Sequence, residues 1–235
     1  MITTAVILAA GLGSRLRPYT DHYPKGFIPL HGEPIVLQSI KKLLAVGMTR
    51  IIIGTGYMKD HYEALQLQYP EIECVENTHY ETTGSMATLA CCQDVIGDDH
   101  FLLLESDLVY PEYVLKVMIQ APHSTVMLAS GETGSGDEVY IDYNNHHILQ
   151  KVSKQPCDLD DVSAELVGIN KISNDAFQQM VQGFNASKNP KLDYEGTMAM
   201  MSAQYQNVVV HKIDDLAWCE IDDESHLRRA EGLVV

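Results

Sequence analysis

Along the first half of the chain, short continuous apolar runs alternate with segments in which apolar residues recur every three or four positions. Residues 4–10 form a short apolar run that predicts a strand. After Pro34, apolar side chains recur every three or four residues as far as Gly47, which predicts an amphipathic helix, and the β-branched run at 50–54 predicts the next strand. The alternation continues with a helix at 59–68, a strand at 72–76, a helix after Gly84 and a strand at 101–104.

Beyond about residue 120 the alternation loosens. Short apolar runs predict strands at 125–129, 138–143, 148–152 and 166–172, then helices at 174–183 and 194–203, strands at 208–211 and 218–221, and a last helix from 224. Strands that alternate with helices form parallel pairs with helices on both faces. We therefore predict an α/β fold, a Rossmann-like, doubly wound mixed sheet that is mainly parallel and has a small antiparallel addition. We expect a single domain over residues 1–235, with halves at 1–120 and 121–235.

Composition narrows the classes of partner. The 235 residues, 46% of them hydrophobic, are enough for one core. Acidic residues outnumber basic ones 32 to 16, and a net charge of −16 repels nucleic acid and anionic membranes, so we expect neither as a partner. The five cysteines are odd in number and form no CxxC pair, which argues against a disulfide framework. With no basic leader and no run of membrane-spanning length, a cytoplasmic location is expected.

A glycine-rich loop follows the first predicted strand. Residues 8–18 read LAAGLGSRLRP, and Gly11 and Gly13 allow successive backbone N–H groups to form a concave anion site. The third glycine of a dinucleotide-binding turn is missing, because Leu16 occupies its place. Arg15 and a second arginine lie in the loop instead, and guanidinium groups match phosphate oxygens. The loop therefore favours a more highly charged ligand than a dinucleotide.

A lysine follows this loop, at a position where a proline stiffens the chain. LAAGLGSRLRP followed by PKGFIPLHGEPI, which contains Lys25, resembles the signature of the sugar-phosphate-type nucleotidyltransferases. The resemblance implies transfer of a nucleoside monophosphate from an NTP to a phosphorylated or phosphonylated acceptor. It makes Arg15 and Lys25 the catalytic cations that contact the phosphates. It places the nucleotide against Leu8, Ala10, Gly11 and Gly13 in the first half of the chain, and the acceptor in the second half.

Carboxylates follow two predicted strands. The strand at 101–104 continues into Glu105 and Asp107, at the edge of the sheet where doubly wound folds bind ligands. The strand at 218–221 runs into Asp222 and Asp223, which the start of a helix would also explain. The family resemblance implies that Asp107 and Asp222 bind Mg²⁺, the expected cofactor. The role of Glu105 is less defined, and Asp223 is an alternative to Asp222.

The segment before the next helix, TTGSMAT at 82–88, can cap that helix or bind a ligand. By resemblance, Gly84 and Ser85 contact the base. The short length, the segment at 135–140 and the segment WCEIDD at 218–223 resemble the cytidylyltransferases that act on 2-aminoethylphosphonate or phosphocholine.

The acceptor site is predicted around a tyrosine between two acids. Tyr194 lies between an aspartate and Glu195, and carboxylates accept hydrogen bonds from a primary ammonium, whereas a quaternary ammonium selects an aromatic cage. The chain has one Trp and four Phe, which favours the primary amine. An acidic first turn of a helix would explain the same acids. By resemblance, Lys154 supports the acceptor phosphate, with Lys151 as the alternative.

The prediction is a Mg²⁺-dependent cytidylyltransferase that transfers CMP from CTP to 2-aminoethylphosphonate and releases pyrophosphate. The alternatives are a CTP:phosphocholine cytidylyltransferase and a sugar-1-phosphate nucleotidyltransferase, which share the core motifs. A nicotinamide oxidoreductase would need the third glycine. A non-catalytic nucleotide sensor would not need the lysine and the acids. We also expect that the chain can be fused to, or followed by, a further enzymatic domain.

Overall fold

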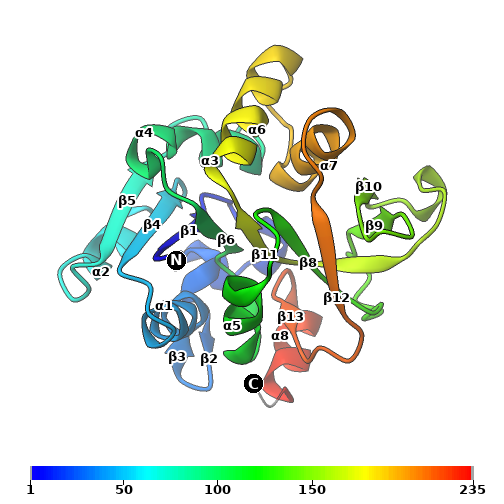
Figure 1. The fold of residues 1–235 in the computed structure, drawn as a ribbon. Coiled ribbons are helices and arrows are strands. Elements are labelled where there is room, and N and C mark those ends of the chain that lie inside the picture. Colours follow the sequence, from blue (N-terminus) through cyan, green and yellow to red (C-terminus); the bar gives the residue numbers. More distant parts are fainter. Residues whose placement is uncertain (1, 234–235) are drawn as a thin grey trace.

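The computed structural model describes residues 2–233, which form a central sheet with helices on both faces (Figure 1). The prediction that a further enzymatic domain can be fused to or follow the chain concerns residues outside the described range. None of the helices formed by residues 2–233 combines the length and the apolar character that crossing a bilayer demands. The strands are β1 (Thr4–Ala9), β2 (Pro29–Leu30), β3 (Glu33–Pro34), β4 (Arg50–Thr55), β5 (Ile72–Glu76), β6 (Phe101–Glu105), β7 (Leu108–Val109), β8 (Val126–Ser130), β9 (Tyr140–Tyr143), β10 (Leu149–Ser153), β11 (Ala164–Ile172), β12 (Val209–Ile213) and β13 (Cys219–Glu220).

The helices connect these strands in the predicted alternation. They are α1 (Ile35–Ala45), α2 (Asp60–Leu65), α3 (Ser85–Cys91), α4 (Gln93–Ile96), α5 (Tyr113–Gln120), α6 (Asn174–Ser187), α7 (Tyr194–Gln204) and α8 (Glu224–Glu231). Three short 3₁₀ turns, Ser14–Leu16, Tyr19–Asp21 and Lys25–Phe27, order the glycine-rich stretch, and a fourth covers Pro156–Asp158.

The main sheet has nine strands in the order β10-β9-β11-β6-β1-β4-β5, with β8 and β12 attached through β11. Strands β5, β4, β1 and β6 are parallel neighbours. The second half adds antiparallel pairs, because β11 runs opposite to β6, β8 and β9. The predicted doubly wound mixed sheet with an antiparallel addition is confirmed. Two-stranded sheets, β13-β7 and β2-β3, complete the fold.

The core lies in layers on the two faces of the sheet, since successive side chains of a strand point to opposite faces. On β1, Val6 and Leu8 pack in the layer under α3, α6 and α7, whereas Ala5 and Ile7 pack in the layer under α1 and α5. Figure 1 shows these two groups of helices above and below the sheet. A third cluster, which includes Leu16, joins the glycine-rich stretch to β13 and α8. This cluster brings the late acidic segment to the glycine loop.

Some elements differ from the prediction. The helix expected at 59–68 is limited to α2, and the helix after Gly84 divides into α3 and α4 at Cys92. The prediction lacks α5, although its buried Val114, Leu115 and Met118 have helical spacing. The strand expected at 218–221 is limited to the two residues of β13, which pair with the equally short β7.

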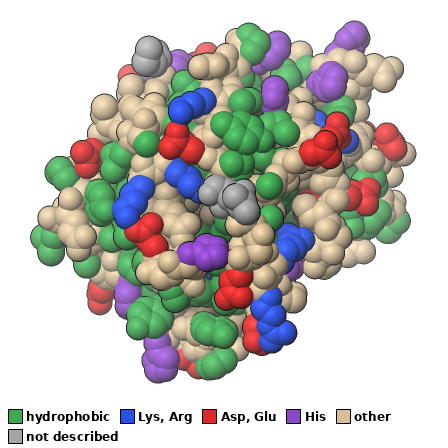
Figure 2. All heavy atoms as spheres, turned by 90° about the horizontal axis from the view of Figure 1, so that it is seen from below, with side chains coloured by type: hydrophobic (Ala, Val, Ile, Leu, Met, Phe, Trp, Pro, Cys, Tyr) green, Lys and Arg blue, Asp and Glu red, His purple; other side chains and the backbone are tan. Residues whose placement is uncertain are grey.

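Charge is mixed on the face of the molecule shown in Figure 2. Apart from the grey atoms, lysine and arginine side chains on that face lie interspersed with acidic, histidine and apolar side chains. Basic side chains on this face are therefore dispersed.

Candidate active site

Two adjoining pockets lie at the carboxyl edge of the parallel strands, where β1 continues into the glycine loop and β6 ends. The larger has a volume of about 360 Å³ and the smaller about 200 Å³. Their common wall consists of Ser85, Glu105, Glu220 and Asp222. An edge of this kind is where open α/β sheets bind ligands.

The glycine loop forms one wall of the larger pocket. All four residues predicted for the nucleotide there line it: Leu8, Ala10, Gly11 and Gly13. Gly13 has a φ of +59°, and a Cβ atom on it would lie 2.9 Å from Cγ2 of Thr20 and 3.3 Å from Cβ of Lys25. Thr20 also donates a hydrogen bond from Oγ1 to the carbonyl of Gly13 at 2.8 Å. Glycine is therefore required where the loop turns against the lysine segment.

Lys25 lies at the junction of the two acidic strand ends. Its side chain is only 16% exposed, and Nζ contacts Asp107, Asp222 at 2.5 Å and Glu220 at 3.5 Å. Burial alone would lower the pKa of Lys25, but these three carboxylates raise it well above its ordinary value. The neighbouring Gly26 lets the chain approach β6, since a Cβ atom there would lie 2.9 Å from the Ser106 carbonyl oxygen. Lys25 is thus a buried, charged group surrounded by acids.

Asp222 is held by both predicted catalytic cations. Besides Lys25, it contacts Nη2 of Arg15 at 2.8 Å, while Nη1 of Arg15 contacts Asp137 at 2.8 Å. Burial opposes ionisation of Asp222, but Lys25 and Arg15 lower its pKa to about 2. Asp223 has a different role, because its Oδ1 accepts hydrogen bonds from the backbone N–H groups of Ser225 and His226 and so caps α8. Of the two rival aspartates, Asp222 is the one that faces the site.

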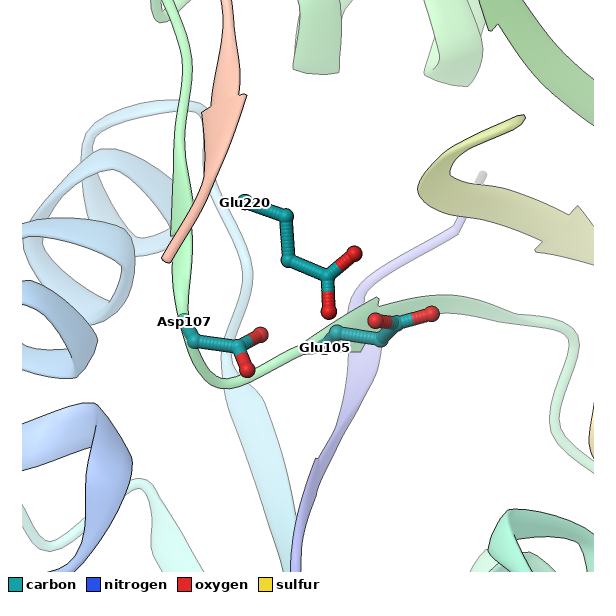
Figure 3. Close-up of side chains that lie close together, drawn as sticks. All are labelled: Glu105, Asp107 and Glu220. Carbon is teal, nitrogen blue, oxygen red and sulfur yellow. The ribbon is translucent and has the colours of Figure 1, made fainter. Parts of the chain in front are cut away.

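A group of three carboxylates lies beside Lys25. Glu220 points from β13 toward the end of β6, where Glu105 and Asp107 lie (Figure 3), and one oxygen of each lies within 4.8 Å of the others. Burial, with Asp107 and Glu195 nearby, raises the pKa of Glu105 to about 8. Asp107 Oδ1 is buried without a hydrogen-bond partner among the described residues. Hard oxygen ligands in this number are suited to a divalent cation.

The predicted base-binding turn at Gly84 and Ser85 packs against, and hydrogen-bonds to, the start of α7. Gly84 has no room for a side chain, since a Cβ atom would lie 2.7 Å from the Lys191 carbonyl oxygen. Ser85 donates hydrogen bonds from N and from Oγ to Asp193, each at 3.1 Å, and its Oγ accepts one from the N–H of Tyr194 at 2.9 Å. Both Gly84 and Ser85 line the larger pocket.

The predicted acceptor residues line the smaller pocket. Tyr194 is buried and donates a hydrogen bond from its hydroxyl to Glu105 at 2.6 Å. Burial, with Asp193 nearby, raises the pKa of Glu195 to about 7. Lys154 contacts Asp137 at 3.2 Å, whereas Lys151 pairs with Asp160 at 3.0 Å and is not among the lining residues. The structure thus places Lys154, and not Lys151, at the pocket.

Two site residues were missed as candidates by the sequence analysis. Glu220 stands two residues before Asp222, so a strand places both side chains on one face, a signal that was available. Asp137 contacts Arg15 from 122 residues away and bridges it to Lys154. No spacing in the sequence indicates that contact.

Two curated proteins are similar to this chain in sequence. A 2-aminoethylphosphonate cytidylyltransferase of Lancefieldella rimae is 36% identical over 107 residues, which is 46% of this chain and 44% of that protein. A CMP-5'-(3-aminopropyl)phosphonate synthase of Streptomyces rubellomurinus is 25% identical over 240 residues, 97% of this chain and 38% of that protein. The chain therefore spans less than half the length of these two relatives.

The fold has a close structural counterpart. The solved CTP:phosphocholine cytidylyltransferase from Streptococcus pneumoniae superposes with a TM-score of 0.79 at 20% identity, covering 98% of each chain. The family described as the MobA-like NTP transferase domain matches residues 5–163, from β1 through the loop before β11. The resemblance to nucleotidyltransferases is confirmed, and the chain belongs to the MobA-like NTP transferase domain family.

Proposed function

We propose that the chain is a Mg²⁺-dependent cytidylyltransferase that transfers CMP from CTP to 2-aminoethylphosphonate and releases pyrophosphate. The observation that carries the proposal is the pair of pockets with a common carboxylate wall and Lys25 beside it. A transferase that joins two substrates needs such adjoining sites, with cations at the junction to counter the charge of the transferred phosphoryl group. The names of the phosphonate-specific relatives support the acceptor class.

The nucleotide is assigned to the larger pocket, built mainly by the first half of the chain. The backbone of Gly11 and Gly13 faces the phosphates, and the turn at Gly84 and Ser85 faces the base. Arg15 supplies a planar guanidinium for the polyphosphate. In the described structure Nη1 and Nη2 of Arg15 each contact an aspartate, but the side chain is 52% exposed and a guanidinium has five N–H donors, so donors remain for a phosphate.

The acids beside Lys25 fit a bound Mg²⁺ ion. Asp107 offers an oxygen that is buried and has no other partner among residues 2–233, and hard carboxylate oxygens are what Mg²⁺ binds. We assign Asp107 and Asp222 as ligands, as the family resemblance implies. The carboxylates with oxygens within 4.8 Å of one another are those of Asp107, Glu105 and Glu220, a group that does not include Asp222. A bound Mg²⁺ ion would neutralise charge on the phosphates of the nucleotide. Lys25 contacts the same carboxylates, so the lysine and the metal compete for them.

The acceptor is assigned to the smaller pocket. Its phosphonate group lies toward Lys154 and Lys25, and an acceptor oxygen attacks the α-phosphorus of CTP in line, so that one P–O bond forms while the bond to pyrophosphate breaks. Glu195 and Tyr194 form the wall on the side of α7. The lining is dominated by carboxylates and contains only two aromatic residues, Tyr194 and Trp218, which favours a primary ammonium over a quaternary one.

The proposal is tested by measuring pyrophosphate release with a matrix of the common NTPs against 2-aminoethylphosphonate, phosphocholine and glucose 1-phosphate. Release should be fastest with CTP and 2-aminoethylphosphonate. Asp107→Asn, which removes a proposed metal ligand, should reduce it to background. Faster release with phosphocholine or with a sugar phosphate would contradict the acceptor assignment, and binding of nucleotide without any release would contradict the enzymatic function.

A further inference from the structure

A buried glutamate in the smaller pocket has no part in the assignments above. Glu165 lies on β11, is 2% exposed and lines that pocket. Its Oε2 accepts a hydrogen bond from the N–H of Thr133 at 2.6 Å, and its Oε1 accepts one from the hydroxyl of Thr133 at 2.9 Å. A carboxylate has about four acceptor positions. Thr133 therefore fixes the orientation of Glu165 and leaves acceptor capacity unused.

The charge of Glu165 has no ion-pair partner within residues 2–233. No nitrogen of a lysine, arginine or histidine among them lies within 4.0 Å of its carboxylate. Arg229 lines the same pocket, but its guanidinium contacts Cys219 Sγ at 3.3 and 3.4 Å. Burial and the neighbouring Glu138 raise the pKa of Glu165, whereas the hydrogen bonds from Thr133 and the charge of Arg229 oppose this shift. A buried carboxylate without a direct ion pair is costly, so this position is suited to a cation supplied by a ligand.

The walls near Glu165 suit a small ammonium on a short carbon chain. Glu138 adds a second negative charge to the pocket, and its carboxylate accepts a hydrogen bond from the Gly136 N–H at 3.1 Å. Leu166 and Trp218 supply apolar surface, with the indole N–H of Trp218 already bonded to Ser130 at 2.9 Å. The pocket thus offers carboxylates for a charged end and apolar surface for a carbon linker.

Glu165 is separated from the acids at the Lys25 junction. Gly168, on the same strand, packs against Glu105, since a Cβ atom there would lie 3.2 Å from Glu105 Oε1. Glu165 and Gly168 are three positions apart on β11, which is at most roughly 10 Å at about 3.3 Å per residue because the strand is irregular between Leu166 and Asn170. Glu165 is therefore placed for the end of the acceptor remote from the transferred group.

We propose that Glu165 is the specificity-determining residue that binds the ammonium group of the acceptor, with Thr133 as the residue that positions it. This inference rests on the proposed function, because it assumes that an aminophosphonate occupies the smaller pocket. An ionised partner makes a hydrogen bond to the ammonium about twice as strong as a neutral one. Glu165 thereby selects an amine over an uncharged chain of the same length.

The test compares 2-aminoethylphosphonate with propylphosphonate, in which a methyl group replaces the ammonium. The kcat and KM of pyrophosphate release are measured with CTP and Mg²⁺ for the wild type and for Glu165→Gln. The variant should lose roughly tenfold to a hundredfold in kcat/KM for the amine, the range for a hydrogen bond to a charged group. The loss should appear mainly in KM, and kcat/KM for propylphosphonate should stay at the wild-type value. Glu132→Gln, the same charge change at an exposed position of the neighbouring loop, should alter neither acceptor.

Thr133→Val provides a second measurement that keeps the charge. It removes the hydroxyl that contacts Glu165, so KM for the amine should rise by a smaller factor, with propylphosphonate again unaffected. Circular dichroism establishes that both variants fold, and if Glu165→Gln does not fold, the result for Thr133→Val decides. If the ratio of kcat/KM for 2-aminoethylphosphonate to kcat/KM for propylphosphonate is unchanged in Glu165→Gln, the inference is overturned. If Glu165→Gln does not fold, the same unchanged ratio in Thr133→Val overturns it. Loss of the preference in Glu195→Gln alone would place the ammonium at α7 and also overturn it. If the wild type releases pyrophosphate with neither phosphonate, the proposed function itself fails, and the inference fails with it.

Discussion

Lys25 compensates three carboxylates, so its removal should cost stability as well as activity. In Lys25→Met the side chain keeps most of its apolar length, but Asp107, Asp222 and Glu220 lose their shared counter-ion. The side chain is 16% exposed, which makes this a largely buried ionic group and not a surface pair. Asp107 and Glu220 then lack a counter-ion and Asp222 keeps only Arg15, and the acids repel one another where Asp107 and Asp222 are largely removed from water.

The size of the stability loss in Lys25→Met follows from the burial of the ion pairs. Removing one partner of a buried ion pair costs about 3–5 kcal/mol. At about 2–4 °C per kcal/mol for a chain of this size, the melting temperature should fall by roughly 6–20 °C. The fall should be greater at pH 8 than at pH 5, because burial and neighbouring Glu105 and Asp107 raise the pKa of Glu220, so this acid can be protonated in the variant. Turnover should fall by orders of magnitude at either pH.

Calorimetry in the presence of EDTA measures the fall in melting temperature without any contribution from bound metal. Lys116→Met is the matched control, because Lys116 is 56% exposed and pairs with Glu112 on the surface of α5, where an ion pair contributes at most about 1 kcal/mol. Lys25→Met/Glu220→Gln, which removes one of the uncompensated charges, should recover part of the loss. Melting of Lys25→Met within about 2 °C of the wild type, less than about 1 kcal/mol for a chain of this size, would refute the compensation described here.

Three further predictions concern other parts of the site. Because burial and neighbouring Asp193 raise the pKa of Glu195 from 4.5 to about 7, the folded state binds the proton more tightly, so stability should fall as pH rises through this window. Urea unfolding at pH 5 and pH 8 should show a loss on the order of 1–2 kcal/mol that Glu195→Gln reduces, and an equal loss in both proteins would contradict the assignment. Gly84→Ala should cost about 1–3 kcal/mol of unfolding free energy and raise KM for CTP, because its Cβ meets a backbone carbonyl, whereas the control Gly183→Ala, with open space, should be neutral or stabilising. Mg²⁺ should raise the melting temperature of the wild type more than that of Asp107→Asn, and equal shifts would place the metal elsewhere.

The order of elements was predictable because hydrophobic spacing differs between strands and helices. The position of Asp107 beside the glycine loop followed from the same pattern, since the parallel neighbours β1 and β6 end at one edge of the sheet. The contact between Lys25 and Asp222 joins residues 197 positions apart, and only the family resemblance linked them in the sequence.

The features that the sequence did not predict depend on tertiary contacts, which produce no periodic pattern in the sequence. The pairing of β13 with β7 involves two residues from each strand, too few for a sequence pattern. The same limit applies to Asp137, whose loop position gives no indication that it bridges Arg15 to Lys154. Glu165 stands in a strand that is buried almost throughout, where an acid can be recognised as exceptional only once the pocket beside it is known.

The P–O–P bond that the proposed reaction makes is observed directly by ³¹P NMR. A sample of the protein with CTP, Mg²⁺ and 2-aminoethylphosphonate should lose the phosphonate and CTP signals while pyrophosphate and a coupled phosphonate–phosphate pair appear. Unchanged CTP and phosphonate signals, in a preparation that converts UTP and glucose 1-phosphate to UDP-glucose and pyrophosphate, would contradict both the base and the acceptor proposed here.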